Sequence, residues 1–330
     1  MLHNKSRLST ENEISGSRVL ITGGAGFIGS HIADQLIKRG AGEVILLDNM
    51  LRGTLANVAG AISTGKVKLI EGTICDESLL DALLEGIDYC FHMAALRITH
   101  CAEHPREALE TMYVGTFNVA EACVKHKVKK LVAASSASIY GMADDFPTTE
   151  QHHPYNNRTL YGAAKAANEL MFRSFKEMFG LDYAATRFFN VYGPRMDIHG
   201  RYTEVLIRWY RLIKEGKSPL IFGDGKQTMD FVYVEDTARS CVLAMQSNAT
   251  DEVFNVAAGE EVSLEQLCWT LLRVMNSDIQ PEYVPVPEGR EKVEVMRRLA
   301  EVSKADRLLG FRVEVPLEEG LRRLVNWLET

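Results

Sequence analysis

The sequence has no long apolar run, no sustained basic segment and no closely spaced cysteine pair. Without about 18 consecutive apolar residues, we expect no helix that crosses a membrane. A net charge of −7 without a basic run argues against nucleic acid as the main partner. The dispersed cysteines indicate buried, reduced thiols in a cytoplasmic protein rather than disulfides. They are Cys75, Cys90, Cys101, Cys123, Cys241 and Cys268.

Metal-binding patterns and targeting signals are also missing. No HExxH motif occurs, and His152 and His153 fall in a predicted loop before Pro154, so we expect no metal site. Residues 1–16 are polar and lack an apolar core, which predicts a loose N-terminal tail rather than a signal peptide. We find no internal repeat or low-complexity tract.

The 330 residues are 46% hydrophobic and 25% charged, which suits a globular enzyme of one large or two closely joined domains. Apolar strand-like runs alternate with helical stretches such as 76–86 and 105–126. This order predicts an α/β fold with a Rossmann-type, doubly wound parallel sheet over residues 17–190. Residues 191–330 are expected to form mainly a smaller, mixed α/β substrate lobe, interleaved with the first domain. The expected strands are 17–22, 43–48, 67–72, 88–95, 129–136 and 182–190.

A glycine-rich loop follows the first expected strand, in the sequence GGAGFIGS. In its GxxGxxG spacing, Gly23 can make the tight turn, Gly26 lets the backbone approach a pyrophosphate, and Gly29 permits close helix packing. The alternative is an ordinary glycine-rich turn between a strand and a helix. The second strand, however, ends in Asp48, at the distance where an acidic side chain binds the adenosine ribose. Its charge favours NAD over NADP, although nearby Arg52 weakens this preference.

Tyr161 and Lys165 are one helical turn apart in TLYGAAKAANELMF. Positions i and i+4 share a helix face, so the Lys165 ammonium can stabilise a Tyr161 phenolate. We expect this neighbour and an oxidised nicotinamide to bring the tyrosine pKa, ordinarily about 10, toward the working range of a base. Alone, the spacing also fits a solvated helix face. The glycine loop upstream favours the catalytic interpretation.

Small polar residues end the fifth expected strand, where ligands of doubly wound folds bind. Ser135, Ser136 and Ser138 lie there, and a serine hydroxyl could donate to a substrate oxygen while Tyr161 exchanges a proton. The alternative is that small residues only allow close packing at the strand end.

Several motifs together resemble the extended short-chain dehydrogenase/reductase superfamily. They are TGGAGFIG, Asp48, HMAA at 92–95, SSASIYG, YGAAK, RFFNVYGPR and the late VSKADRLLGF. The resemblance extends over nearly the whole chain from Ser17 onward. It is strongest to the nucleotide-sugar epimerases of the UDP-galactose 4-epimerase type.

The resemblance implies roles for individual residues. Ser136 and Tyr161 would contact the sugar 4-hydroxyl, and Lys165 would hold the nicotinamide ribose and tune Tyr161. Arg97 would lie near the cofactor phosphates and Asn190 at the nucleotide diphosphate. The implied cofactor contacts are Gly23, Gly26, Phe27, Ile28, Gly29, Asp48, Asn49, Ile74, Ala94, Ala95, Arg97, Tyr161 and Lys165; the implied substrate contacts are Ser136, Ser138, Asn190 and Arg195.

The same resemblance implies an NAD-dependent 4-epimerase acting on a UDP-hexose such as UDP-glucose, UDP-N-acetylglucosamine or UDP-glucuronic acid. Tyr161 would take the hydroxyl proton, the sugar C4 would be oxidised and then reduced on its other face, and NAD would be regenerated. A homodimer is also implied, formed by the helices that hold Tyr113 and Tyr161.

The chain departs from the family pattern at three places. Thr73 stands where many members have an adenine-binding aspartate, leaving Asp76 further on, and Tyr113 replaces the asparagine of NVxGT near the active site. Met229 stands where an arginine commonly binds the pyrophosphate. Another cation must then offset that charge, and the candidates are Arg195, Arg201, Arg290 and Arg298.

Other activities remain open. A 4,6-dehydratase would show an Asp-Glu pair where Ala137 and Ser138 follow Ser136, and elimination lacks its proton carriers without that pair. A reductase or decarboxylase acting on a related sugar would show net consumption or production of NADH. A non-catalytic NAD-binding sensor or scaffold tends to lose the tyrosine or the lysine, whereas this chain has both.

Overall fold

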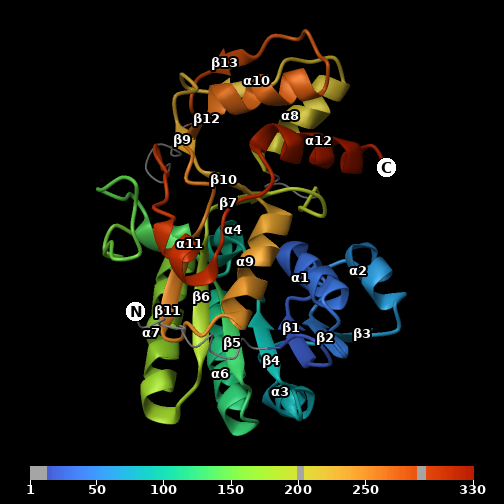
Figure 1. Ribbon diagram of the computed structural model, residues 1–330. Helices are drawn as coiled ribbons and strands as arrows, with labels where there is room; N and C mark the ends of the chain where they lie inside the picture. The colour runs from blue at the N-terminus through green and yellow to red at the C-terminus, as the bar shows by residue number, and fades with distance from the viewer. Residues whose placement is uncertain (1–12, 199–203, 288–294) are drawn as a thin grey trace, which may run out of the picture.

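The computed structural model describes residues 13–198, 204–287 and 295–330. Its centre is a seven-stranded sheet in the order β11-β6-β5-β4-β1-β2-β3, and every pair is parallel (Figure 1). The six strands expected from the sequence are confirmed. The seventh, β11, was missed because it lies in the C-terminal part, where the alternation of strands and helices weakens. The strands are β1 (Arg18–Thr22), β2 (Glu43–Asp48), β3 (Val67–Glu71), β4 (Tyr89–His92), β5 (Lys130–Ser136), β6 (Tyr183–Phe188) and β11 (Glu252–Val256).

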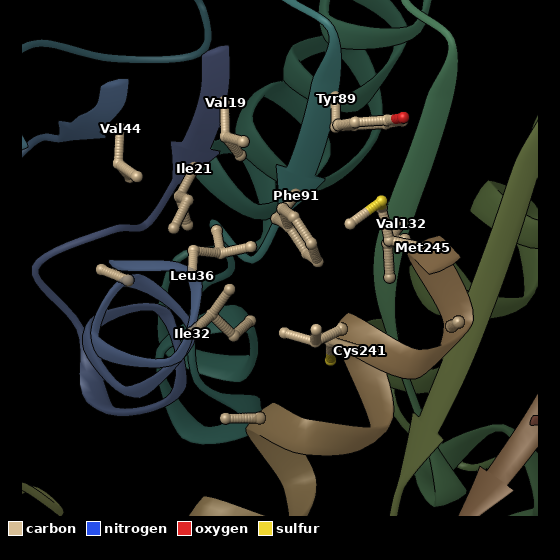
Figure 2. Packing of buried hydrophobic residues seen from close by; sticks show 14 of the residues in the cluster. Val19, Ile21, Ile32, Leu36, Val44, Tyr89, Phe91, Val132, Cys241 and Met245 are labelled. Carbon is tan, nitrogen blue, oxygen red and sulfur yellow. The ribbon is translucent and has the colours of Figure 1, made fainter. Parts of the chain in front are cut away.

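Helices cover both faces of this sheet, because its strands are apolar on both sides. One face packs against α1 (Phe27–Lys38), α2 (Leu55–Ile62) and α9 (Val234–Gln246). The other packs against α3 (Glu77–Leu84), α6 (Gly115–Lys125) and α7 (Leu160–Phe179). Figure 2 shows Leu36 of α1 and Cys241 of α9 beside Ile21 and Phe91 of the sheet. The arrangement confirms the doubly wound, Rossmann-type architecture.

The second lobe has a core of its own. Helices α8 (Val205–Lys214), α10 (Leu264–Val274) and α12 (Leu317–Leu328) enclose it. Trp209 packs α8 into this lobe: it is 1% exposed and its Nε1 donates to the Leu220 carbonyl oxygen at 2.7 Å. Short strand pairs complete the lobe: β10 (Phe231–Tyr233) with β7 (Asn190–Tyr192), β12 (Val262–Ser263) with β9 (Thr228–Met229), and β13 (Glu282–Val284) with β8 (Leu220–Phe222).

The helix expected over 105–126 is divided. It runs as α5 (Pro105–Leu109), a π-helical turn η1 (Glu110–Val114) and then α6, with α4 (Ile98–Glu103) before it. Elsewhere, the 3-10 helix η2 (Ala137–Tyr140) follows β5, and α11 (Ser303–Leu309) follows the segment that crosses back between the lobes.

Two expectations about exposure need correction. Residues 1–12 of the expected tail lie outside the described residues, but the apolar side chain of Ile14 is 3% exposed and belongs to the first core. Five cysteines are buried, whereas Cys75 is exposed in the turn after β3. Among the described helices, none is long and apolar enough to span a bilayer.

Candidate active site

One cavity of about 680 Å³ opens at the carboxyl ends of the parallel strands, against the second lobe. The structure brings every site residue predicted from the sequence to its wall, including the glycine loop, Asp48, Ser136, Tyr161 and Lys165. The others are Asn49, Ile74, Ala94, Ala95, Arg97, Ser138, Asn190 and Arg195. Their individual roles stay predictions.

The glycine loop is built for close backbone contact. Gly23 has φ +67°, and a Cβ there would lie 2.7 Å from the Ala94 nitrogen. A Cβ at Gly29 would lie 2.3 Å from the Gly23 carbonyl oxygen, so only glycine fits either position. Helix α1 then starts at Phe27 without a side-chain cap. Its first amide groups therefore remain available to an anion such as a pyrophosphate.

Asp48 ends β2 beside this loop and is 6% exposed. Its carboxylate accepts the amide of Ala25 at 3.0 Å and the amide of Met50 at 2.9 Å. Burial raises the pKa of this carboxyl above its ordinary value, and the backbone hydrogen bonds oppose that rise. A carboxylate has about four acceptor positions, so capacity remains for ribose hydroxyls. The loop and this carboxylate fit a dinucleotide.

Arg97 lines the cavity, and its charge is shared with a carboxylate. Asp197, from the segment after β7, lies 3.3 Å from Arg97 Nη2 and 3.4 Å from Arg52 Nε. Burial, followed by the charge of Arg97, lowers the pKa of Arg52. No sequence pattern indicated Asp197, because its ion pairs join residues that are far apart in the chain.

Helix α7 presents the predicted acid/base couple to β5. Thr159 caps the helix by accepting the Gly162 amide at 3.0 Å, which fixes the turn that holds Tyr161. The Tyr161 hydroxyl lies near the Ser136 side chain, which acts to lower the pKa of the phenol. Lys165 Nζ donates to the Ala134 carbonyl oxygen at 2.5 Å and lies 5.8 Å from the centre of the Tyr161 ring. The three predicted catalytic groups therefore meet at one strand end.

The protein's own groups do not lower the pKa of Tyr161, and the expected lowering also depended on an oxidised nicotinamide. Burial raises the pKa of the Tyr161 phenol, and the hydrogen bond with Ser136 and the charge of Arg52 oppose that rise. Burial also lowers the pKa of Lys165 to about 8, although the charge of Glu169 acts to raise it. The reason is desolvation, which disfavours the phenolate and the ammonium alike in this enclosed site.

Tyr113 does not lie at the active site, which corrects another expectation. Its side chain is 40% exposed on the outer face of η1. The preceding residue, Met112, is the one that points inward: it is 2% exposed, and its sulfur accepts the Leu96 amide at 3.1 Å. In the helical turn, adjacent residues point about 100° apart, so a difference of one position moves the side chain out of the site.

Met229 lines the cavity with an apolar side chain, and two of the candidate cations lie on the same wall. Arg195 Nη2 pairs with Asp34 at 2.8 Å, and its Nη1 is buried without a hydrogen-bond partner in the ranges that the structure describes. The Arg298 guanidinium has no hydrogen bond or ion pair with the described residues, and burial alone lowers its pKa to about 10. Arg201 and Arg290 lie outside the described residues.

Within the described ranges, one group of side chains has the spacing of metal ligands: Asp144, His152 and His153. The His152 Nε2 lone pair is already engaged by the Asp144 amide at 3.1 Å, and Nδ1 donates to the His153 carbonyl oxygen at 2.8 Å. The group lies outside the wall of the cavity.

Comparison with known proteins gives the same assignment as the geometry. Residues 19–257 match the model of the NAD dependent epimerase/dehydratase family. The chain is 34% identical to a putative UDP-glucose 4-epimerase from Methanocaldococcus jannaschii, over 94% of this chain and 98% of the relative. It is 32% identical to a UDP-N-acetyl-alpha-D-glucosaminuronate decarboxylase from Bacillus cytotoxicus, over 94% of this chain and 97% of the relative.

Among solved structures, the chain is similar to UDP-N-acetylglucosamine 4-epimerase from Methanobrevibacter ruminantium in complex with UDP-N-acetylmuramic acid. The TM-score is 0.89 at 33% identity, over 96% of this chain and 99% of that one. Three observations lead to one assignment: the glycine loop with Asp48, the centre formed by Ser136, Tyr161 and Lys165, and the family match over residues 19–257. The chain is a member of the NAD-dependent epimerase/dehydratase family, an enzyme family whose cofactor is NAD.

Proposed function

We propose that this protein is a UDP-sugar 4-epimerase that uses bound NAD and acts on a UDP-hexose such as UDP-glucose, UDP-N-acetylglucosamine or UDP-glucuronic acid. The observation that carries the proposal is the meeting of Ser136, Tyr161 and Lys165 on the cavity that the glycine loop also lines. The residues after Ser136 are Ala137 and Ser138, so the acidic pair needed for dehydration is missing from this strand end.

In this proposal the chain supplies a proton relay and a positioning scaffold. Bound NAD supplies reversible oxidation of the sugar carbon. Ser136 orients the sugar hydroxyl through its Oγ, and Tyr161 takes the hydroxyl proton and later returns it. Lys165, next to the ring, favours the phenolate. The first amides of α1 and the Asp48 carboxylate would hold the pyrophosphate and the adenosine ribose of NAD.

We propose that Arg298 takes the place of the arginine that the family commonly has at position 229. Its backbone amide donates to the Thr228 carbonyl oxygen at 3.0 Å, so Arg298 starts from the chain segment directly beside Met229. Its guanidinium lines the cavity without a carboxylate partner among the described residues. A buried, uncompensated cation is costly unless an anion binds beside it, and a substrate diphosphate meets that need.

A homodimer is part of the proposal. An apolar hollow of about 610 Å³ lies along α6 and α7 and includes Phe117, Leu170, Met178 and Phe179. Leu170 is 67% exposed and Met178 is 70% exposed, which is unusual for a face of this size on a monomer. The same face on a second copy, related by a two-fold axis, would cover it.

The test is to incubate the purified protein with UDP-glucose, UDP-N-acetylglucosamine and UDP-glucuronic acid separately and to resolve the products by NMR. We expect inversion at C4, without added NAD and without net NADH. Tyr161→Phe should lose turnover but bind UDP-sugar as the wild type does. A pentose product would instead identify a decarboxylase, like the matched relative, and a 4-keto-6-deoxy product a dehydratase. If the wild type showed no turnover and Tyr161→Phe left its ligand binding unchanged, a non-catalytic NAD-binding protein would be favoured.

A further inference from the structure

Glu169 is a buried carboxylate behind the candidate active site that the proposed chemistry does not use. It is 9% exposed and lies on α7, four residues after Lys165 and eight after Tyr161. Residues at this spacing line one face of a helix, in successive turns. Glu169 therefore lies on the same face of α7 as Tyr161 and Lys165, one turn further along the helix.

This face of α7 contacts the end of β5 residue by residue. The Ala134 carbonyl oxygen accepts from Lys165 Nζ, the Ser135 hydroxyl donates to Glu169 Oε1, and the Ser136 side chain lies near the Tyr161 hydroxyl. Three consecutive strand residues thus face three turns of the helix. A shift of α7 along β5 would break all of these contacts at once.

The Glu169 carboxylate is also held from β6. Arg187, which is the register partner of Ser135, binds it through two nitrogens: Nε to Oε1 at 2.9 Å and Nη2 to Oε2 at 2.6 Å. Its Nη1 donates to the Tyr140 hydroxyl at 2.9 Å and to the Glu150 carbonyl oxygen at 3.0 Å. This bidentate contact with an arginine, together with the Ser135 hydroxyl, fixes the carboxylate in position.

A buried ion pair is more often neutral or costly than stabilising, because both charges lose their hydration. Stability alone therefore gives a weak reason for Glu169 and Arg187 to lie under a catalytic strand end. The position of Glu169 one turn from Lys165 gives a stronger one. Desolvation opposes the charge on Lys165, and Glu169 is the largest of the influences that favour it.

We propose that Glu169 is a positioning residue for the proposed Ser136, Tyr161 and Lys165 centre: held by Ser135 and Arg187, it fixes α7 against β5 and supplies the buried negative charge that keeps Lys165 an ammonium. This inference rests on the proposed function for its catalytic consequence only. Tyr161 shares the helix face with Lys165, Cys101 reaches the ammonium from α4, and His92 faces it from β4. Of these groups, Glu169 is the permanent anion.

The test compares Glu169→Gln, which removes the charge with little change of shape, with the wild-type protein. NMR titration of the lysine ε-carbons in ¹³C-labelled protein, with the Lys165 signal assigned from Lys165→Met, reports the protonation of Lys165 without any turnover. We expect Lys165 in Glu169→Gln to lose its proton at least about one pH unit lower than in the wild type, because an opposite charge on the next turn is missing. The alkaline limb of the kcat profile should move by the same amount, which is about a tenfold loss of kcat on that limb.

Two further variants separate positioning from folding. Glu169→Gln leaves Arg187 buried without its partner, so Glu169→Gln/Arg187→Met removes both charges and should recover folding while keeping the shifted titration. Glu177→Gln makes the same chemical change on the exposed part of α7 and should match the wild type. A Lys165 titration within about 0.2 pH units of the wild type in both Glu169 variants would overturn the inference. Absence of turnover in the wild type would overturn the proposed function instead, and the NMR titration would still decide the role of Glu169.

Discussion

At the scale of single residues, the site depends on charges that are buried and only partly compensated. Lys165, Arg195 and Arg298 all face the cavity, and the described part of the chain pairs only Arg195 with a carboxylate. Such a wall favours an anionic ligand, since Arg298 loses hydration without a matching carboxylate among the described residues. A UDP-sugar brings two phosphates to this wall.

Arg298→Met should raise the KM for the UDP-sugar by about 10- to 100-fold, because a hydrogen bond between charged groups contributes about 1.5–3 kcal/mol. The kcat should change little, since Arg298 is proposed to bind the diphosphate in both the ground state and the transition state. Steady-state kinetics measure both values. Arg297→Met is the control: this neighbouring arginine pairs with Glu261 at 2.7 Å outside the cavity and should leave KM unchanged. Equal effects in the two variants would contradict the assignment.

His92 is a buried neutral residue that links β4 to β1 and α6. The Thr22 hydroxyl lies 2.7 Å from its Nδ1 and the Thr116 hydroxyl lies 3.0 Å from its Nε2. Thr116 donates its own proton to the Met112 carbonyl oxygen, so it accepts from Nε2–H, which leaves Nδ1 to accept from Thr22. Burial lowers the pKa of His92 to about 3.

This pKa predicts a loss of stability in mild acid. The unfolded chain binds a proton at His92 below a pKa of about 6.5, whereas the folded chain binds it only near pH 3, so the unfolded state gains protons first as the pH falls. The contribution of neutral His92 to the free energy of unfolding should therefore be complete well above pH 6.5 and about 2 kcal/mol smaller at pH 5. Urea unfolding between pH 5 and 8 measures the slope. His92→Gln should be less stable at pH 8 but lack this part of the slope; parallel curves for the two proteins would contradict the prediction.

At the scale of elements, the N-terminus of α7 couples helix stability to catalysis. Thr159 caps α7 two residues before Tyr161, and Ser263 caps α10 by accepting the Gln266 amide at 3.0 Å, in the other lobe. The two caps are chemically matched, but only the first lies beside the cavity.

Thr159→Ala and Ser263→Ala should each cost about 1 kcal/mol of unfolding free energy, because each loses one capping hydrogen bond. Only Thr159→Ala should also lower kcat, by about tenfold or more, since the first turn of α7 carries Tyr161. Chemical denaturation and kcat under saturating substrate give the two quantities. A kcat effect of the same size in Ser263→Ala would show that general loss of stability is responsible.

Whether a feature could be predicted from the sequence depended on whether it is local in the chain. Strands β1 to β6 were predictable because each is a short apolar run at the spacing of a βα unit, and the glycine loop, Asp48, Tyr161 and Lys165 were predictable because local motifs specify them. Strand β11 and the Arg187 partner of Glu169 were not, since both depend on pairing between distant segments.

Tyr113 was misplaced because the π-helical turn and a one-residue difference in position decide which side chain points inward. The effect of burial on the Tyr161 pKa could not be predicted, because a sequence does not show which side chains are enclosed.

At the scale of the whole molecule, the exposed apolar face of α6 and α7 predicts association. Leu170→Glu should convert a dimer into a monomer, because a carboxylate at the centre of the paired faces would be buried without a partner. Sedimentation velocity measures the mass. Leu308→Glu changes an equally apolar side chain on α11, 40% exposed and away from this face, and should leave the dimer intact. A monomeric wild-type protein at micromolar concentration would contradict the prediction.

The position of α9 and β11 has a consequence for how the chain is made. Cys241 and Met245 of α9 pack in the same core as Phe91 and Ile21 of the sheet (Figure 2), and β11 forms the edge of the sheet beside β6 (Figure 1). A ribosome therefore releases β1 to β6 well before the segments that shield them have been translated. During that interval the nascent chain presents an uncovered apolar surface and an open strand edge, which are features that holding chaperones bind and that favour aggregation. Ending the gene after residue 190 would make that interval permanent.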